Sequence, residues 1–94
     1  MSGGRLADEA LARELAATPG WERDGDALRR LWRFADFKSA MIFVNGVAAL
    51  AEKANHHPDV TIHYNEVTLR LWSHDAGGLT TRDFSLARAI GATL

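Results

Sequence analysis

One long stretch of the chain limits the fold more than any other part. From Phe37 to about Ala54, apolar residues recur with the period of an α-helix, which predicts a long amphipathic helix. Its main apolar stripe consists of Phe37, Ala40, Met41, Val44, Val47, Ala48 and Ala51. A second apolar group lies off this stripe: Ile42, Phe43, Ala49 and Leu50. A helix with two apolar sides has two surfaces to cover, so we expect one side to pack on the domain and the other on a second subunit.

The length of the chain supports that expectation. Its 94 residues fit one domain, 1–94, and leave no room for a second core. A domain of this size buries only about 60–65 % of the surface that its unfolded chain exposes. Association of copies buries more surface, and we therefore expect a homodimer or a homotetramer. The alternative is that a single domain core wraps both apolar sides of the helix.

Two hairpins flank the long helix. A short amphipathic helix is predicted over 6–17, and the hairpin that follows it turns at Asp24-Gly25-Asp26. Beyond Pro58 a second hairpin is predicted, with its turn at Asn65-Glu66. The apolar residues that alternate along this second hairpin are Val60, Ile62, Tyr64, Val67, Leu69 and Leu71.

The last element is a helix predicted over 81–90. Thr80 is placed as its N-cap with Asp83 at the third helical position, and Leu79 and Phe84 have the spacing of a hydrophobic staple. The predicted order is helix-β-β-helix-β-β-helix. This order indicates an α+β fold, a four-stranded antiparallel sheet with three helices packed on one face.

Histidines gather in one part of the chain. His56, His57, His63 and His74 lie between positions 56 and 74, and none lies elsewhere. Because an imidazole gives and accepts protons near neutral pH, such a cluster favours acid–base catalysis or a metal site. The first two follow the long helix and the last precedes a glycine-rich loop, and loops at such junctions commonly carry functional side chains. The alternative for each histidine is a solvated surface position.

Four other residues are candidates for a site. Glu52 precedes His56 by four positions, so the two side chains can hydrogen-bond if the helix extends that far; the alternative is an exposed charge at a helix end. Asp83 is explained by its capping position alone. Trp21 and Trp72 could stack on a planar heterocycle, although large aromatic residues in a small domain more often belong to the core or to an interface.

Together these residues form a pattern that resembles the pterin carbinolamine dehydratase family. The pattern comprises Glu52-Lys53-Ala54-Asn55-His56-His57-Pro58, Tyr64, His74 and Asp83. The likeness continues through Trp32-Arg33-Phe34-Ala35-Asp36-Phe37, Gly77-Gly78-Leu79-Thr80 and Asp83-Phe84, and it covers about 21–90. Ser73 stands where many members have threonine.

The resemblance implies a reaction and an assembly. The reaction is that of a hydro-lyase, which removes water from a 4a-hydroxytetrahydropterin to give the quinonoid dihydropterin in the recycling of tetrahydrobiopterin. Neither a metal nor an organic cofactor takes part. The implied assembly is a dimer or tetramer in which sheets join edge to edge and the long helices pack between dimers.

The resemblance also implies the site residues. The catalytic residues are His56, His57 and His74. The residues that bind the substrate or shape its pocket are Pro58, Glu52, Asp83 and Trp21. We expect His56 and His74 to transfer protons and His57 mainly to bind, since the first two bracket the glycine-rich loop.

Two other functions are alternatives. A metal enzyme would use His56, His57 and His74 with Glu52 as ligands, although adjacent histidines rarely both face one metal. A protein-interaction module would use the long helix, as in family members that bind the dimerisation segment of a transcription factor. Turnover of a hydroxypterin distinguishes the enzyme from the interaction module.

Composition excludes several other classes. The net charge of −1, with scattered basic residues, gives no reason to expect direct binding of nucleic acid. The chain has no cysteine and so no disulfide, thiolate zinc site or cysteine nucleophile. No apolar run approaches the ~20 residues of a membrane span, and the first residues lack the apolar stretch of a signal peptide. We therefore expect a cytoplasmic protein that does not bind membranes.

Overall fold

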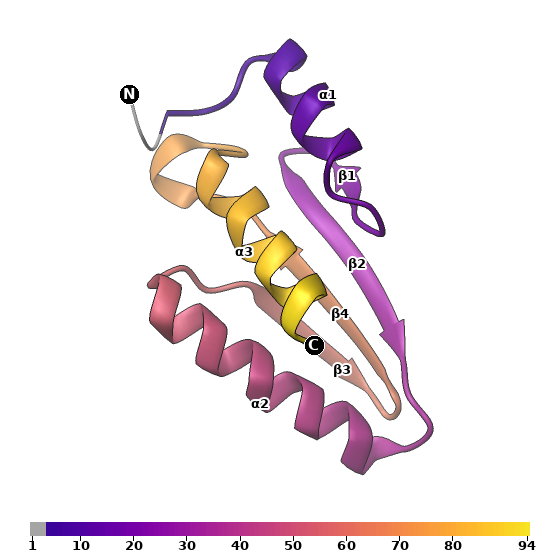
Figure 1. Ribbon diagram of the computed structural model, residues 1–94. Coiled ribbons are helices and arrows are strands. Elements are labelled where there is room, and N and C mark those ends of the chain that lie inside the picture. The colour runs from indigo at the N-terminus through magenta and orange to yellow at the C-terminus, as the bar shows by residue number, and fades with distance from the viewer. Residues whose placement is uncertain (1–3) are drawn as a thin grey trace.

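The computed structural model describes residues 4–94 and contains one sheet with helices on one of its faces (Figure 1). In chain order the elements are α1 (Asp8–Ala16), β1 (Glu22–Asp24), β2 (Ala27–Arg33), α2 (Phe37–Ala54), β3 (Asp59–His63), β4 (Glu66–Leu71), the 3-10 turn η1 (His74–Ala76) and α3 (Thr81–Thr93). The strands are antiparallel throughout and lie in the order β1-β2-β4-β3. The predicted α+β architecture is confirmed.

The sheet has one apolar and one polar face. Along β4 the side chains of Val67, Leu69 and Leu71 are fully buried, and the intervening residues are only partly covered. This alternation is typical of a strand with one face on a core. The opposite face carries ion pairs between neighbouring strands, such as Arg33 with Glu66 at 2.6 Å. The helices therefore cover the apolar face, and the polar face is open.

The core side of α2 agrees with the predicted stripe in part. Its buried residues are Ala40, Phe43, Val47 and Ala51, of which all but Phe43 belong to that stripe. Phe43, predicted on the subunit side, is 6 % exposed and its ring lies 4.7 Å from that of Trp32. Phe37, predicted in the stripe, is 50 % exposed because it opens the first turn, immediately after the N-cap residue Asp36. Ile42 lies on the outward side as predicted and is 64 % exposed.

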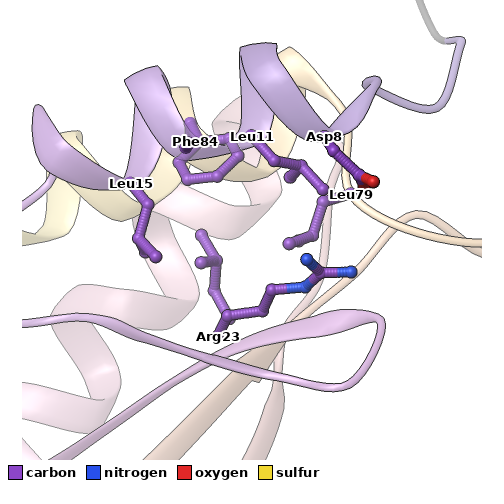
Figure 2. A pocket seen from close by; sticks show the side chains of 8 residues that line it. Asp8, Leu11, Leu15, Arg23, Leu79 and Phe84 are labelled. Atoms are coloured by element: carbon purple, nitrogen blue, oxygen red, sulfur yellow. The ribbon is translucent and has the colours of Figure 1, made fainter.

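The helix α1 packs through Leu11 and Leu15 over the start of α3 (Figure 2). A hollow of about 170 Å³ remains beneath it, bordered by Arg23, Leu79 and Phe84 among others. Leu79 and Phe84, the predicted staple of α3, are both buried. Apolar residues thus fix the direction in which the chain enters α3.

Two boundaries differ from the sequence-based expectation. The turn between β3 and β4 consists of Tyr64 and Asn65, and Glu66 already pairs with His63 in the ladder. Tyr64 is therefore not a strand residue; its φ of 53° lies in the left-handed region, and its side chain is 63 % exposed. The helix α3 continues to Thr93 instead of ending near residue 90. None of the helices within residues 4–94 has the length and apolar character needed to cross a membrane.

Candidate active site

The end of α2 positions the first two histidines. Asn55 follows the last helical residue with φ 50° and ψ 43°, a left-handed conformation that asparagine adopts more readily than most residues. The backbone N–H of His56 then donates to the Ala51 carbonyl at 3.1 Å, which closes the helix end. Pro58 next leads the chain into β3. The chain therefore leaves the helix axis at Asn55, and His56 and His57 lie outside the helix.

A tight loop after β4 positions the third histidine. The backbones of Ser73 and Gly78 bond in both directions, with N···O distances of 3.0 and 3.3 Å. His74 opens the 3-10 turn within this loop, and Gly77 closes the turn with φ 69°, where a side chain would be strained. The paired ends of the loop hold His74 at a fixed place beyond the sheet.

The two segments meet at one hollow of about 360 Å³. It is lined by Asn55, His56, His57, Trp72, Ser73, His74 and Asp75. The three histidines that the sequence singled out as a site therefore share one cavity. His63 lies apart, at the far end of β3, with Nδ1 3.6 Å from Glu66. His56 also borders a second hollow, of about 580 Å³, between α2 and α3.

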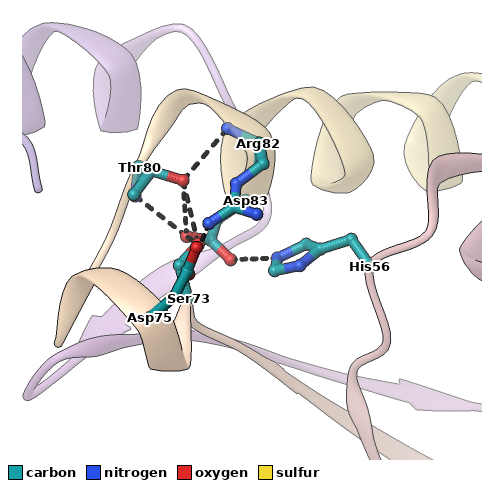
Figure 3. A network of polar contacts seen from close by, with 6 residues as sticks. All are labelled: His56, Ser73, Asp75, Thr80, Arg82 and Asp83. Atoms are coloured by element: carbon teal, nitrogen blue, oxygen red, sulfur yellow. Dashed lines mark hydrogen bonds and ion pairs between the residues drawn. The ribbon is translucent and has the colours of Figure 1, made fainter. Parts of the chain in front are cut away.

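His56 is backed by a buried carboxylate (Figure 3). Its Nε2 lies 2.5 Å from Oδ1 of Asp83, whose side chain is fully buried. The other oxygen of Asp83 accepts from the backbone N–H of Thr80 at 2.9 Å and from the hydroxyl of Ser73 at 2.8 Å. Asp83 thus caps α3, as predicted, and also orients the His56 ring. The resemblance placed both residues at the site, but local sequence patterns could not predict this contact, because the two residues lie far apart in the chain.

His57 has a different carboxylate partner, in solvent. Its Nε2 lies 2.5 Å from Oε2 of Glu52, and 56 % of the His57 side chain and 77 % of the Glu52 side chain are exposed. The pairing of Glu52 with His56, expected only if the helix extended that far, does not form, since the helix ends before His56 and an i, i+4 contact requires a continuous helix. An exposed pair of this kind is weak compared with the buried pair at Asp83.

His74 packs against an aromatic side chain. Its ring centroid lies 4.4 Å from that of Trp72, with 38° between the planes. The guanidinium of Arg70 lies over the Trp72 ring, 4.9 Å from the ring centroid. Within residues 4–94, no carboxylate forms an ion pair with His74. The exposed His74 ring can therefore exchange protons with solvent more freely than His56.

Asp75 adds a negative charge to the rim of the hollow. Its Oδ1 accepts from Arg82 at 2.6 Å. The hydrogen bond from Arg82 holds the pKa of the Asp75 carboxyl below its usual value. Sequence reasoning did not single out Asp75, although its position next to His74 was an available signal.

None of the four predicted binding residues lines this hollow: Asp83 and Glu52 contact its histidines from behind, and Trp21 and Pro58 lie elsewhere. Trp21 is 6 % exposed and packs edge-on against Trp32, with 5.5 Å between centroids. The cavity that it borders is a different one, beside Arg30 and Arg88. Pro58 lines a small groove with Glu52 and Val60, adjacent to His57. Trp72, named only as a possible stacking residue, is the tryptophan that borders the histidines.

The geometry supplies proton donors and acceptors around a cavity with an aromatic wall. His56 and His57 have carboxylate partners and His74 has none in the described part of the chain, so the three rings differ in electrostatic environment. Proton donors and acceptors beside an aromatic side chain suit acid–base chemistry on a flat heterocycle. Among residues 4–94, no three histidine or acidic side chains gather closely enough to hold a metal ion.

Comparison with known proteins identifies similar chains. The family model described as Pterin 4 alpha carbinolamine dehydratase matches residues 4–93. A protein of Thermomicrobium roseum that carries this dehydratase name provisionally is 57 % identical over 86 residues, 92 % of each chain. Another from Acidobacterium capsulatum, with the same provisional name, is 49 % identical over 90 residues, 96 % of this chain and 98 % of that one.

Solved structures agree on the fold. A crystal structure titled as a transcriptional coactivator/pterin dehydratase of Brucella melitensis matches with a TM-score of 0.90 and 34 % identity, over 95 % of this chain and 97 % of that one. A pterin dehydratase-like protein, described as a RuBisCO assembly factor in the alpha-carboxysome, matches with a TM-score of 0.62 over 77 % of this chain and 83 % of that one. Its identity of 19 % makes this second likeness one of fold alone.

Proposed function

Since the chain belongs to the pterin 4 alpha carbinolamine dehydratase family, we propose that it removes water from a 4a-hydroxytetrahydropterin by acid–base catalysis at the histidine hollow. The observation that carries this proposal is the meeting of His56, His57 and His74, from two separate segments, around one cavity. A flat bicyclic substrate can lie against the Trp72 ring while its edge faces the imidazoles.

The reaction requires two proton transfers. The C4a–O bond breaks and the oxygen leaves as water after it accepts a proton from an acid. The N5–H bond gives its proton to a base, and its electron pair forms the C4a=N5 double bond of the quinonoid dihydropterin. One proton is given to the leaving oxygen and one is taken from N5, so the step is redox-neutral and needs no oxidant or reductant. Two imidazoles in different protonation states supply both transfers.

We assign the base to His56 and the acid to His74. The buried Asp83 carboxylate stabilises the positive charge that His56 acquires when it takes the N5 proton. His74 is exposed and borders the same hollow, so its imidazolium can protonate the leaving oxygen and then regain a proton from solvent. His57, held by Glu52 at the rim, binds and orients the pterin.

Alanine variants test these assignments. The dehydration of a 4a-hydroxytetrahydropterin is followed by absorbance, with the spontaneous reaction subtracted. We expect His56→Ala and His74→Ala each to lose about 10²–10⁴-fold in kcat, the usual contribution of one acid or base. We expect His57→Ala mainly to raise KM. If the unmodified protein gives no acceleration, the proposed reaction is refuted; a larger kcat loss for His57→Ala than for both others would refute the assignment of roles.

Homo-oligomerisation is supported by exposed apolar residues: Ile42 on α2 is 64 % exposed, and Val60 and Ile62, on the helix-covered face of the edge strand β3, are 41 % and 39 % exposed. We propose a homodimer or homotetramer that covers these residues. We further propose that the protein acts in the cytoplasm, in the recycling of tetrahydrobiopterin, without direct nucleic-acid contacts.

A further inference from the structure

Two buried hydroxyl groups lie behind the Asp83 carboxylate (Figure 3). Ser73, at the base of the loop that carries His74, is 1 % exposed, and Thr80, the N-cap of α3, is fully buried. The Ser73 hydroxyl oxygen lies 2.8 Å from Oδ2 of Asp83 and 2.9 Å from Oγ1 of Thr80. Oγ1 of Thr80 in turn accepts from the backbone N–H of Arg82 at 3.2 Å. These groups form an unbroken hydrogen-bonded chain.

The Asp83 carboxylate decides the direction of these hydrogen bonds, together with their lengths. The backbone N–H of Arg82 can only donate, and the Asp83 carboxylate can only accept. Oγ1 of Thr80 accepts from Arg82, and the hydroxyls of Ser73 and Thr80 are the side-chain donors within reach of Oδ2, at 2.8 and 3.4 Å. If Ser73 donated to Thr80 instead, its lone pair would face Oδ2 at 2.8 Å and only the longer Thr80 bond would remain, so the shorter Ser73 contact is the donated bond.

This direction has a consequence for His56. Oδ2 of Asp83 receives the Ser73 hydroxyl and the Thr80 backbone N–H, so Oδ1 is the oxygen left for the imidazole. Since Oδ1 accepts, Nε2 of His56 must carry the proton. In the neutral ring Nδ1 then holds the lone pair, and within residues 4–94 no side chain or backbone group hydrogen-bonds it.

We infer that Ser73 and Thr80 are positioning residues for the reaction proposed above. They act through Asp83 to hold His56 as its Nε2–H tautomer, with Nδ1 as the nitrogen that takes the substrate proton. The inference rests on the proposed function for its kinetic consequence, whereas the tautomer itself is a property of the resting protein.

Variants at Ser73 test the kinetic consequence. Ser73→Ala removes a donor to a charged acceptor, and we expect kcat to fall about 10–100-fold. Ser73→Thr restores a hydroxyl and should retain kcat within about threefold. Ser85→Ala on the exposed side of α3 is the matched control and should leave kcat unchanged. Equal kcat for Ser73→Ala and the unmodified protein would overturn the inference, as would a failure of Ser73→Thr to exceed Ser73→Ala.

The tautomer is measured independently of activity and of variant folding. In ¹⁵N-labelled unmodified protein, at a pH where His56 is neutral, long-range ¹H–¹⁵N spectra distinguish a protonated Nε2 from a protonated Nδ1. We expect protonated Nε2 in the unmodified protein and in Ser73→Thr, and a mixture of tautomers in Ser73→Ala. Protonated Nδ1 in the unmodified protein would overturn the inference. If the spectra agree but no dehydration is detected, the proposed function fails and the hydrogen-bonded chain stands.

Discussion

Replacement of Asp83 by asparagine separates the orientation of His56 from the folding of α3. The buried amide can keep its oxygen on the side of the Thr80 N–H and Ser73 hydroxyl, where it still caps the helix. Its NH₂ group then faces His56 and can only donate, so Nε2 must accept and the proton moves to Nδ1. The nitrogen assigned as the base would then be blocked.

The expected size of the effect follows from this change of tautomer. Loss of the carboxylate behind a catalytic histidine, with geometry retained, lowers kcat by as much as ~10⁴ in serine proteases. We expect a loss of about 10²–10⁴-fold for Asp83→Asn, with the free energy of unfolding lowered by only about 1–3 kcal/mol, the cost of an imperfectly paired buried group. Absorbance kinetics measure the first quantity and urea denaturation the second.

Glu52→Gln provides the comparison. It alters the other carboxylate–histidine pair, which is exposed, so we expect a loss of less than about fivefold. The reasoning is refuted if Asp83→Asn retains more than half of the unmodified kcat while folded, or if Glu52→Gln loses as much activity as Asp83→Asn.

Three further predictions concern the scaffold and the assembly. Asn55→Ala should lower the free energy of unfolding by about 1 kcal/mol, because alanine is strained at φ 50°, and Asn55→Gly should lower it less; equal effects in urea denaturation would contradict this. NMR titration should give the Asp75 carboxyl a pKa below its usual ~3.9. The stabilisation from its pairing with Arg82 is then present above the pKa that Asp75 has in the unfolded protein, and it is lost as the pH falls through the pKa that Asp75 has in the folded protein. Arg82→Ala should return that pKa toward the usual value, and an unchanged pKa would show that Arg82 is not its cause. If the outward side of α2 is a subunit contact, Ile42→Asp should shift the distribution of sedimentation coefficients toward smaller species; an unchanged distribution would place the contact elsewhere.

Local patterns predicted much of the fold. The bounds of α2, the capping of α3 by Thr80 and Asp83, and the alternation of β4 all depend on residues close together in the sequence. Periodicity did not decide which of two apolar sides of α2 enters the core. Phe43 is buried because its ring packs against Trp32, on β2, and Phe34, just after β2. That contact depends on how the helix lies across the sheet.

The site was predicted in outline and not in its contacts. The sequence indicated that His56, His57 and His74 belong together, and the structure brings them to one hollow. It did not indicate which carboxylate pairs with which ring. The left-handed conformation of Asn55 ends the helix and changes the direction of the chain. Glu52 therefore contacts His57, and His56 contacts Asp83. A contact between residues so distant in the chain requires the tertiary structure.

A crystal structure with a bound pterin analogue is the most direct test of the site. We predict a single pterin ring against Trp72, with Nδ1 of His56 within hydrogen-bond reach of N5 and the His74 ring near C4a. A pterin bound in another cavity, with these imidazoles facing only solvent, would contradict it.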